Sequence, residues 1–175
     1  MTDGKDKERP VSATIHAMAY RIGIGHDLHR LQPGGRLMLA GVCVSTQTSA
    51  VAHSDGDVVL HALVDAILGA LGLGDIGERF DSADPQWKNA DSGVFVADAM
   101  RELQTRRASI VNLDVTILAE RPVLKPFKPQ MRARLSELTG CANVNVKAGT
   151  NEGCDAVGRG EAISATVAAL IELPG

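Results

Sequence analysis

The chain has 175 residues, enough for one domain, and its 3% aromatic content means that the core must be built from aliphatic residues. The net charge is −3 with acids and bases intermixed, which argues against a nucleic-acid-binding face or a polybasic membrane patch. Three widely spaced cysteines form no CxxC pair, which indicates reduced thiols of a cytoplasmic protein rather than disulfides or a zinc-thiolate site.

Residues 1–19 are predicted to be a disordered N-terminal tail. This segment lacks the apolar core of a signal peptide, and its acidic residues argue against a transit peptide. No internal repeat or linker divides the rest, so a single domain is expected at residues 20–175.

The first third of the chain predicts two strands, over residues 20–25 and 36–45, joined as an antiparallel hairpin and followed by a mobile loop at 46–51. Gly23 and Gly25 suggest a dinucleotide fingerprint. We reject it because Leu28 stands where the third glycine belongs and no apolar-periodic helix follows.

A polar turn at residues 53–56 leads into a helix that is apolar nearly all round, as in a buried helix. Ser54 and Asp57 have the spacing of a capping box. Asp57, His61 and Asp65 are four residues apart and share one face of the helix. Two interpretations remain open: a core histidine hydrogen-bonded between two carboxylates, or a metal ligand or catalytic group.

Asp27 and His29 are two residues apart, so in extended chain their side chains point to the same side, roughly 6.5–7 Å apart. A D-x-H pair is common on exposed loops and often has no role. Together with His61, however, the pair forms a two-histidine, one-carboxylate set, which commonly holds catalytic zinc with one open position. Sequence alone does not bring the pair to the helix, so this set is a hypothesis.

The rest of the chain predicts alternating helices and strands. The glycine-rich segment 72–77 is either a helix stop or a close approach to a ligand, with Asp75 accepting from sugar hydroxyls. Trp87 is predicted to be a packing anchor. Further elements are a helix from Asp91 or Ser92 to about 107, a strand over 110–119, a proline-rich connection at 120–129, a helix over 130–138, a strand over 143–148 and a helix over 161–173.

This order of elements predicts an α+β fold, a two-layer α/β sandwich with one mixed sheet of about four or five strands and helices on one face. The strands are rich in valine and leucine. The uncovered face of the sheet is therefore expected to be buried by a partner.

The chain resembles the 2-C-methyl-D-erythritol 2,4-cyclodiphosphate synthase family over about residues 20–173. The motifs that carry the resemblance are G-x-G-x-D-x-H from Gly23, A-H-S-D-G-D from Ala52 continuing to H-A-L-x-D from His61, L-G-D-I-G from Leu73, D-P from Asp84, A-D-S from Ala90, N-x-D-x-T-I from Asn112, N-V-K-A from Asn145 with Thr150 and Glu152, and G-R-G-E from Gly158.

The resemblance implies a catalytic domain that forms a homotrimer, with the sheets packed around a threefold axis and active sites at subunit interfaces. It implies a metal-dependent phosphorus–oxygen lyase of the non-mevalonate isoprenoid pathway. The 2-phosphate of 4-diphosphocytidyl-2-C-methyl-D-erythritol 2-phosphate would attack the β-phosphorus, expelling CMP and closing a cyclic diphosphate.

The resemblance also implies roles for residues. Zinc would be bound by Asp27, His29 and His61, and Mg²⁺ or Mn²⁺ by Glu152, with Asp65 supporting the metal-binding region. Catalytic contacts are implied for His53, Ser54, Thr150 and Glu152. The substrate-binding residues implied are Asp27, His29, His53, Ser54, Asp75, Ile76, Gly77, Ala119, Pro122, Val123, Leu124, Lys125, Ala148, Gly149, Thr150, Asn151, Glu152 and Arg159.

Several positions depart from the family pattern. Ser82 replaces an acid, Val123 a lysine and Gly149 a threonine or lysine, while Ala156 stands in a segment that lines an axial cavity associated with isoprenoid diphosphates. Two other functions therefore remain: a metal-dependent phosphohydrolase that uses water, and a weakly catalytic sensor of cytidine nucleotides or isoprenoid diphosphates. The retained metal-ligand set counts against the sensor.

Overall fold

The structure of the protein is a computed structural model that describes residues 18–81 and 83–175. The predicted tail up to residue 17, and the departure at Ser82, lie outside the described residues. The first strand begins at Ala19, so the last residue of the predicted tail belongs to the fold.

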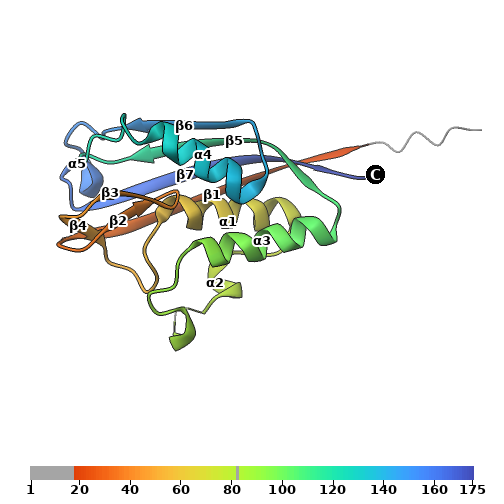
Figure 1. The fold of residues 1–175 in the computed structure, drawn as a ribbon, viewed down its shortest axis with the longest axis horizontal. Coiled ribbons are helices and arrows are strands. Elements are labelled where there is room, and N and C mark those ends of the chain that lie inside the picture. The colour runs from red at the N-terminus through yellow and green to blue at the C-terminus, as the bar shows by residue number, and fades with distance from the viewer. Residues whose placement is uncertain (1–17, 82) are drawn as a thin grey trace, which may run out of the picture.

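A five-stranded mixed sheet forms one layer, with the strand order β4-β1-β7-β5-β6 (Figure 1). Strand β1 (Ala19–Pro33) runs antiparallel to β4 (Thr48–Ala50) and to β7 (Ala162–Leu173). Strand β5 (Ser109–Leu118) runs antiparallel to β7 and parallel to β6 (Val144–Gly149). The predicted two-layer α+β architecture is confirmed.

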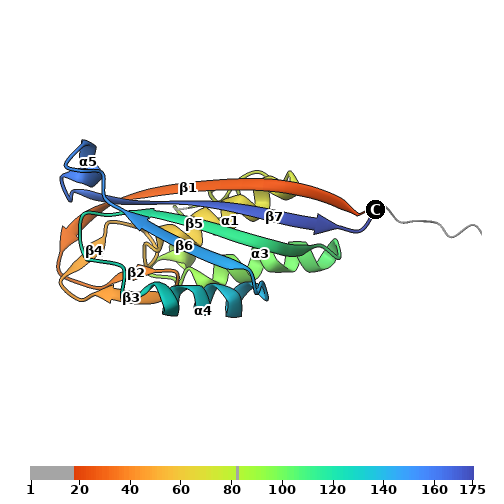
Figure 2. The same ribbon diagram turned by 90° about the horizontal axis from the view of Figure 1, so that it is seen from above.

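Helices form the second layer on one face of the sheet (Figure 2). They are α1 (Val58–Leu71), α3 (Gly93–Thr105) and α4 (Lys128–Thr139). The short helices are α2 (Ile76–Arg79), the 3₁₀ turn η1 (Pro85–Trp87) and α5 (Asp155–Gly158), which lies at the end of the sheet opposite the C-terminus. Within the described part of the chain, no helix has both the length and the apolar composition needed to cross a bilayer.

The start of the chain differs from the prediction. Strand β1 continues through Asp27 and His29, so this pair lies on a strand and not on a loop. The predicted hairpin between the first two strands is wrong, because residues 36–45 fold back on themselves as β2 (Leu37–Leu39) and β3 (Val42–Ser45). Ala40 and Gly41 form the turn, both at positive φ, as a tight hairpin requires. Strand β4 occupies three of the six residues of the predicted loop at 46–51.

The predicted C-terminal helix over residues 161–173 is also wrong, since this segment is β7, the central strand of the sheet. The aliphatic side chains of this segment fit the period of a helix as well as that of a strand. Residues on both faces of β7 are buried over Ala162–Ala165, and both α1 and α5 contact this strand. The alternation that marks a half-buried strand is therefore weak.

The remaining elements agree with the prediction to within a few residues. The helix α1 begins at Val58, however, so Asp57 is its N-cap and the predicted capping box with Ser54 is wrong. Gly72 ends α1 in the left-handed conformation, and Gly140 ends α4 in the same way.

Gly23 and Gly25 bring the backbone of β1 directly against α1. A Cβ atom at Gly23 would lie 1.7 Å from the carbonyl oxygen of Ala66, and one at Gly25 would lie 1.9 Å from that of Ala62. These glycines therefore serve the packing of strand on helix, in agreement with the rejection of a dinucleotide fingerprint. The same packing holds β1 beside the first turns of α1.

The opposite face of β1 is bare and apolar. Tyr20, Ile22, Ile24 and Leu28 alternate along the strand and are all at least half exposed, with Ile22 at 72% and Ile24 at 69%. Large apolar side chains gathered on one face of a sheet mark an interaction surface.

Candidate metal centre and active site

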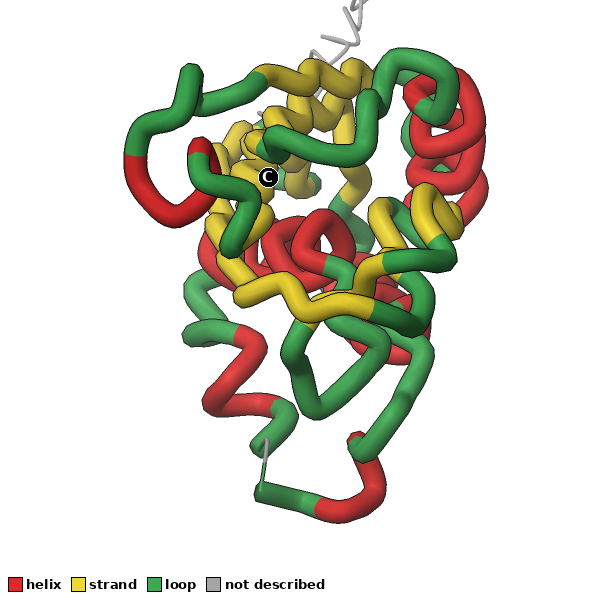
Figure 3. Tube along the Cα trace, turned by 90° about the vertical axis from the view of Figure 1, so that its left-hand side faces the viewer, coloured by secondary structure: helices red, strands yellow, loops and turns green. Residues whose placement is uncertain are grey.

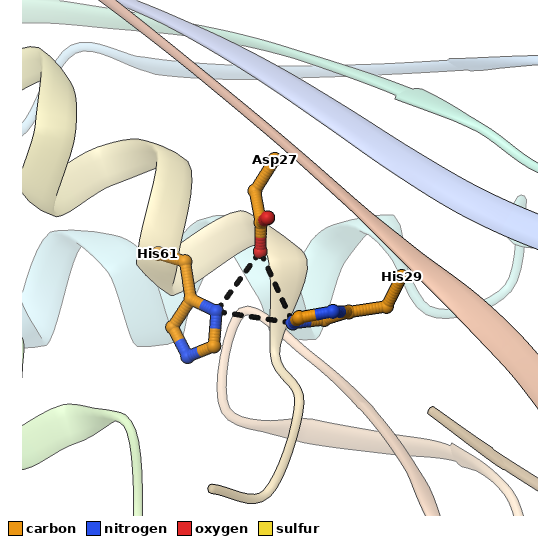
Figure 4. Close-up of side chains that lie close together, drawn as sticks. All are labelled: Asp27, His29 and His61. Atoms are coloured by element: carbon orange, nitrogen blue, oxygen red, sulfur yellow. Dashed lines mark hydrogen bonds and ion pairs between the residues drawn. The ribbon is translucent and has the colours of Figure 1, made fainter. Parts of the chain in front are cut away.

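Three ligand atoms from β1 and α1 converge on one point (Figure 4). His61 Nδ1 lies 2.9 Å from Asp27 Oδ2, His29 Nε2 lies 3.2 Å from the same oxygen, and the two nitrogens are 3.3 Å apart. The structure therefore brings together the three residues that the sequence singled out. They form a group that could hold a metal ion.

The backbone explains this convergence. Asp27 and His29 alternate with the exposed Leu28 on β1, so both side chains point to the helical face of the sheet. His61 lies in the first turn of α1, and its amide donates to the carbonyl oxygen of Asp57, the N-cap. Each ligand is thus fixed by hydrogen-bonded secondary structure.

Burial and mutual contact shift the pKa values of this cluster. Burial alone would raise the pKa of Asp27, but the hydrogen bond to His61 and the charges of both histidines hold it below its ordinary value. Burial lowers the pKa of His29, against the opposing attraction of Asp27. The cluster therefore favours an ionised carboxylate beside a neutral imidazole, the forms in which these residues bind cations.

The other interpretation of His61, a core histidine held between two carboxylates of its own helix, is wrong. Asp57 is fully buried and accepts from the amides of Ala40, Gly41, Val59 and Leu60. Its burial raises its pKa despite these bonds.

Asp65 accepts instead from the amide of Ile76, at 2.7 Å. Burial raises the pKa of Asp65, while the Ile76 amide opposes the shift. This bond fastens the start of α2 to the middle of α1, close to the metal-ligand cluster.

A cavity of about 240 Å³ opens beside the three ligands. Its lining combines residues predicted for the site with an aromatic wall, namely Asp27, His29, Ala52, His53, Ser54, His61, Ile76, Gly77, Phe80, Trp87 and Phe95. Phe80, Trp87 and Phe95 pack with ring centroids 4.7–5.6 Å apart, which confirms Trp87 as a packing anchor. Asp75 caps α2 by accepting from the Glu78 amide, directly before the lining residues Ile76 and Gly77.

A second cavity, of about 510 Å³, lies where the parallel strands β5 and β6 end. Its lining contains residues that the resemblance implies for substrate binding, namely Ala119, Pro122, Val123, Leu124, Lys125, Ala148, Gly149 and Thr150, together with Glu120 and Lys128. The carboxyl ends of parallel strands are a common position for ligand binding. The linings of the two cavities share no residue.

The family model described as the YgbB family matches residues 20–172 of the chain. The chain belongs to the YgbB family. The chloroplastic 2-C-methyl-D-erythritol 2,4-cyclodiphosphate synthase of Oryza sativa subsp. japonica is 44% identical over 157 residues, which are 89% of this chain and 71% of that protein. The bifunctional enzyme IspD/IspF of Nitrobacter winogradskyi is 48% identical over 88% of this chain, which spans 39% of that longer enzyme.

Solved structures share the fold. The IspF protein of Plasmodium falciparum, in complex with CDP, has a TM-score of 0.78 at 29% identity, covering 89% of this chain and 96% of that one. A CDP-bound form of 2C-methyl-D-erythritol-2,4-cyclodiphosphate synthase has a TM-score of 0.79 at 37% identity, covering 86% and 99%. The YgbB-family fold therefore extends over nearly all of the described chain.

The last predicted site residues lie around the turn after β6. The Thr150 hydroxyl donates to Glu152 Oε1 at 3.1 Å, and the exposed Glu152 has a φ of 51°. Asn151 donates to Asp155, and Arg159 forms an exposed ion pair with Glu161. The YgbB-family chain thus carries these groups on a loop around α5.

Two residues that touch the centre were missed as site residues. Ser92 is fully buried and lies 2.9 Å from His61 Nε2, and Asp55 accepts from the hydroxyl of Ser92. Sequence analysis treated Ser92 as a possible helix cap and as part of the A-D-S motif without a role, and its side chain makes no capping bond to α3. No sequence signal joined Ser92 to the centre, because His61 is 31 residues away along the chain.

Proposed function

We propose that this YgbB-family chain converts 4-diphosphocytidyl-2-C-methyl-D-erythritol 2-phosphate to 2-C-methyl-D-erythritol 2,4-cyclodiphosphate and CMP, as a phosphorus–oxygen lyase of the non-mevalonate isoprenoid pathway. The observation that carries the proposal is the Asp27–His29–His61 cluster at the wall of a cavity, in a chain 44% identical to a protein named for this synthase.

Zinc is the cation proposed for this cluster, because the donor set fits it. Tetrahedral zinc with bonds of about 2.0–2.1 Å separates its ligand atoms by about 3.3 Å, and the three observed separations are 2.9–3.3 Å. Three protein ligands leave one position for a substrate oxygen. We assign Mg²⁺ or Mn²⁺ to Glu152, whose exposed carboxylate is a hard oxygen ligand.

When bound, the two cations neutralise phosphate charge and align the attacking and leaving oxygens. The residues of the chain supply position and enclosure. His53, Ser54, Ile76 and Gly77 line the first cavity beside the ligands. His53 and Ser54 contact the erythritol phosphate, while Asp75, the N-cap of α2, and the backbone of Gly77 hold the erythritol hydroxyls.

At the second cavity, Ala119, the backbone of residues 122–125 and Ala148 hold the cytosine, and Thr150 contacts the diphosphate. Asn151 and Arg159 flank this side of the substrate. The nucleophile is the substrate's own phosphate, so no strongly basic side chain is required, and catalysis rests on positioning and electrostatics.

A homotrimer is the assembly proposed. The two cavities share no lining residue, and the bare face of β1 presents Ile22 and Ile24 to a partner. A cyclic assembly that packs three such faces together covers them and brings the second cavity of one chain to the first cavity of its neighbour. We also propose a cytoplasmic location, from the reduced thiols, although the rice relative is named as chloroplastic.

Phosphorus NMR of the purified protein with substrate, zinc and magnesium tests the reaction. We expect resonances of a cyclic diphosphate together with an equimolar amount of CMP. Free phosphate or an opened diphosphate would establish the phosphohydrolase instead, and bound but unchanged substrate would establish the sensor.

Sedimentation tests the trimer. We expect the mass of three chains, and Ile24→Lys should lower both this mass and turnover while leaving zinc binding intact, because all three zinc ligands come from one chain. Val94→Lys, at an exposed valine on α3, is the matched control and should leave the mass unchanged. A wild-type monomer with full activity would contradict a shared site.

A further inference from the structure

The nitrogen of His61 that faces away from the proposed metal has its own hydrogen-bond chain. His61 Nδ1 belongs to the ligand cluster, while Nε2 lies 2.9 Å from Ser92 Oγ. The Ser92 hydroxyl donates to Asp55 Oδ1, and the Ser92 amide donates to Asp55 Oδ2 at 3.1 Å. Both carboxylate oxygens of one aspartate are thus directed at one buried serine.

The direction of these bonds follows from the chemistry of the groups. A carboxylate can only accept, so the hydroxyl proton of Ser92 points to Asp55 and the serine oxygen keeps its lone pairs for His61. His61 Nε2 must then be the N–H that donates, which leaves Nδ1 without a proton. An imidazole nitrogen binds a cation only in that form.

We propose that Asp55 and Ser92 are positioning residues that fix His61 in the tautomer and ring orientation that bind the metal. Partners of this kind raise the basicity of a metal-binding imidazole as well as orienting it. The inference rests on the proposed metal site and adds two residues that the family resemblance did not assign.

The surrounding backbone holds the chain of bonds in place. The Asp55 amide donates to Ala90 O at 3.0 Å, and the Asn89 amide donates to His53 O at 2.8 Å, so the loop before α1 is fastened to the segment before α3. Ser54 Oγ also lies 3.1 Å from His61 Nε2 and is a second acceptor, but it is itself bonded to the Gly56 amide. The fully buried Ser92, with a carboxylate behind it, gives the His61 proton a fixed direction.

Zinc affinity of the purified, metal-stripped protein, measured by competition with a chelating dye, tests the proposal. We expect Asp55→Asn and Ser92→Ala each to weaken zinc binding by about 10–100-fold. The double variant should be no weaker than the weaker single variant, because the two residues act through one bond to His61. Asp91→Asn, one residue from Ser92 and bonded to the Gly93 amide instead, is the control and should change affinity less than about twofold.

Nitrogen-15 NMR of the zinc-loaded wild-type protein gives a readout that needs no variant to fold. We expect His61 to be bound through Nδ1 with an exchange-protected Nε2–H, whose exchange becomes faster in Ser92→Ala. Coordination through Nε2, wild-type affinity in both single variants, or additive losses in the double variant would overturn the role of Asp55 and Ser92. A wild-type protein that binds no zinc would overturn the metal site as well, so the two failures are distinguishable.

Discussion

The two cavities differ in what forms their walls. The ligands of the first lie on β1 and α1, which pack so closely that two glycines are required between them. The second is lined mainly by the connection after β5 and the turn after β6, where Val123 is 62% exposed. The three metal ligands of the first all come from one chain, whereas the second lies at the ends of β5 and β6 and contains none of them.

This difference matches the two tasks that the reaction requires. A metal ligand set must keep its geometry within fractions of an ångström, which rigid, hydrogen-bonded elements provide. A nucleotide can be held by backbone groups on a loop, which adapt to the ligand. The η1 segment, which contributes Trp87 to the wall of the first cavity, extends away from the sheet beyond α2 when the molecule is seen along the strands (Figure 3). We therefore expect substitutions at the three ligands of the first cavity to act on metal binding, and substitutions in the lining of the second cavity to act on nucleotide affinity.

The largest expected effect is the loss of His61. We expect His61→Ala to reduce turnover on the order of 10³-fold or more, because it removes one of the three proposed zinc ligands and with it the positive charge at the reacting phosphates. Asp75→Asn should cost only on the order of tenfold, since it removes one acceptor to the erythritol hydroxyls. Steady-state CMP release measures both. Equal losses in the two variants would contradict the distinction between metal centre and substrate contact.

The packing beneath the first cavity is expected to have the next largest effect. Gly25→Ala would place a methyl group 1.9 Å from the carbonyl oxygen of Ala62, one residue from His61. We expect the free energy of unfolding to fall by about 3 kcal/mol or more, because neither backbone can move without breaking the sheet or the helix. Urea unfolding measures this loss. Gly69→Ala, a helical position where a Cβ meets open space, is the control and should be tolerated.

Sequence analysis predicted the residues of the metal centre better than the elements that carry them. The D-x-H spacing fits extended chain and the buried α1 showed its apolar run, so the ligands could be named. The position of β1 in the sheet depends on its pairing with β7. The β7 sequence is rich in alanine and buried on both faces over Ala162–Ala165, so its pattern fits a helix as well as a strand. Ser92 could not be assigned for a similar reason: its partners His61 and Asp55 are 31 and 37 residues away, and only the tertiary fold joins them.

The cation site proposed at Glu152, next to Thr150 on the turn after β6, should respond to substitution without any change at the zinc site. We expect Glu152→Gln to reduce turnover about 10–100-fold at fixed magnesium, because the neutral amide is a weaker ligand for a hard cation. Zinc affinity should stay at the wild-type value, since Glu152 is not one of the three ligands of that cluster. Raising the magnesium concentration should partly restore turnover. A parallel loss of zinc affinity would show that the two regions are coupled within one chain.

A smaller effect is expected from pH on the metal-free protein. The pKa values of Asp27 and His29 are both lower in the folded state than their ordinary values, so protons bind more tightly to the unfolded chain. The stability from these groups is present above the ordinary pKa values, about 6.5 for histidine and 3.9 for aspartate. It is lost as pH falls through the lowered folded values. Urea midpoints in EDTA should therefore decrease from neutral toward acidic pH, and His29→Gln should flatten the upper part of this decrease.

The smallest expected effect is a gain at the second cavity. Val123 stands where the family resemblance implies a lysine, and its exposed side chain lines the second cavity. We expect Val123→Lys to tighten CMP binding by about two- to fivefold, because an exposed ion pair contributes only about 0.2–1 kcal/mol in water. Calorimetry at low and high salt measures the gain, which should vanish at high salt as screening increases. Val94→Lys adds the same charge on α3 and controls for net charge. A gain that persists in high salt would mean that the substitution acts through the conformation of the loop and not through the added charge. That result would contradict an exposed ion pair at the second cavity.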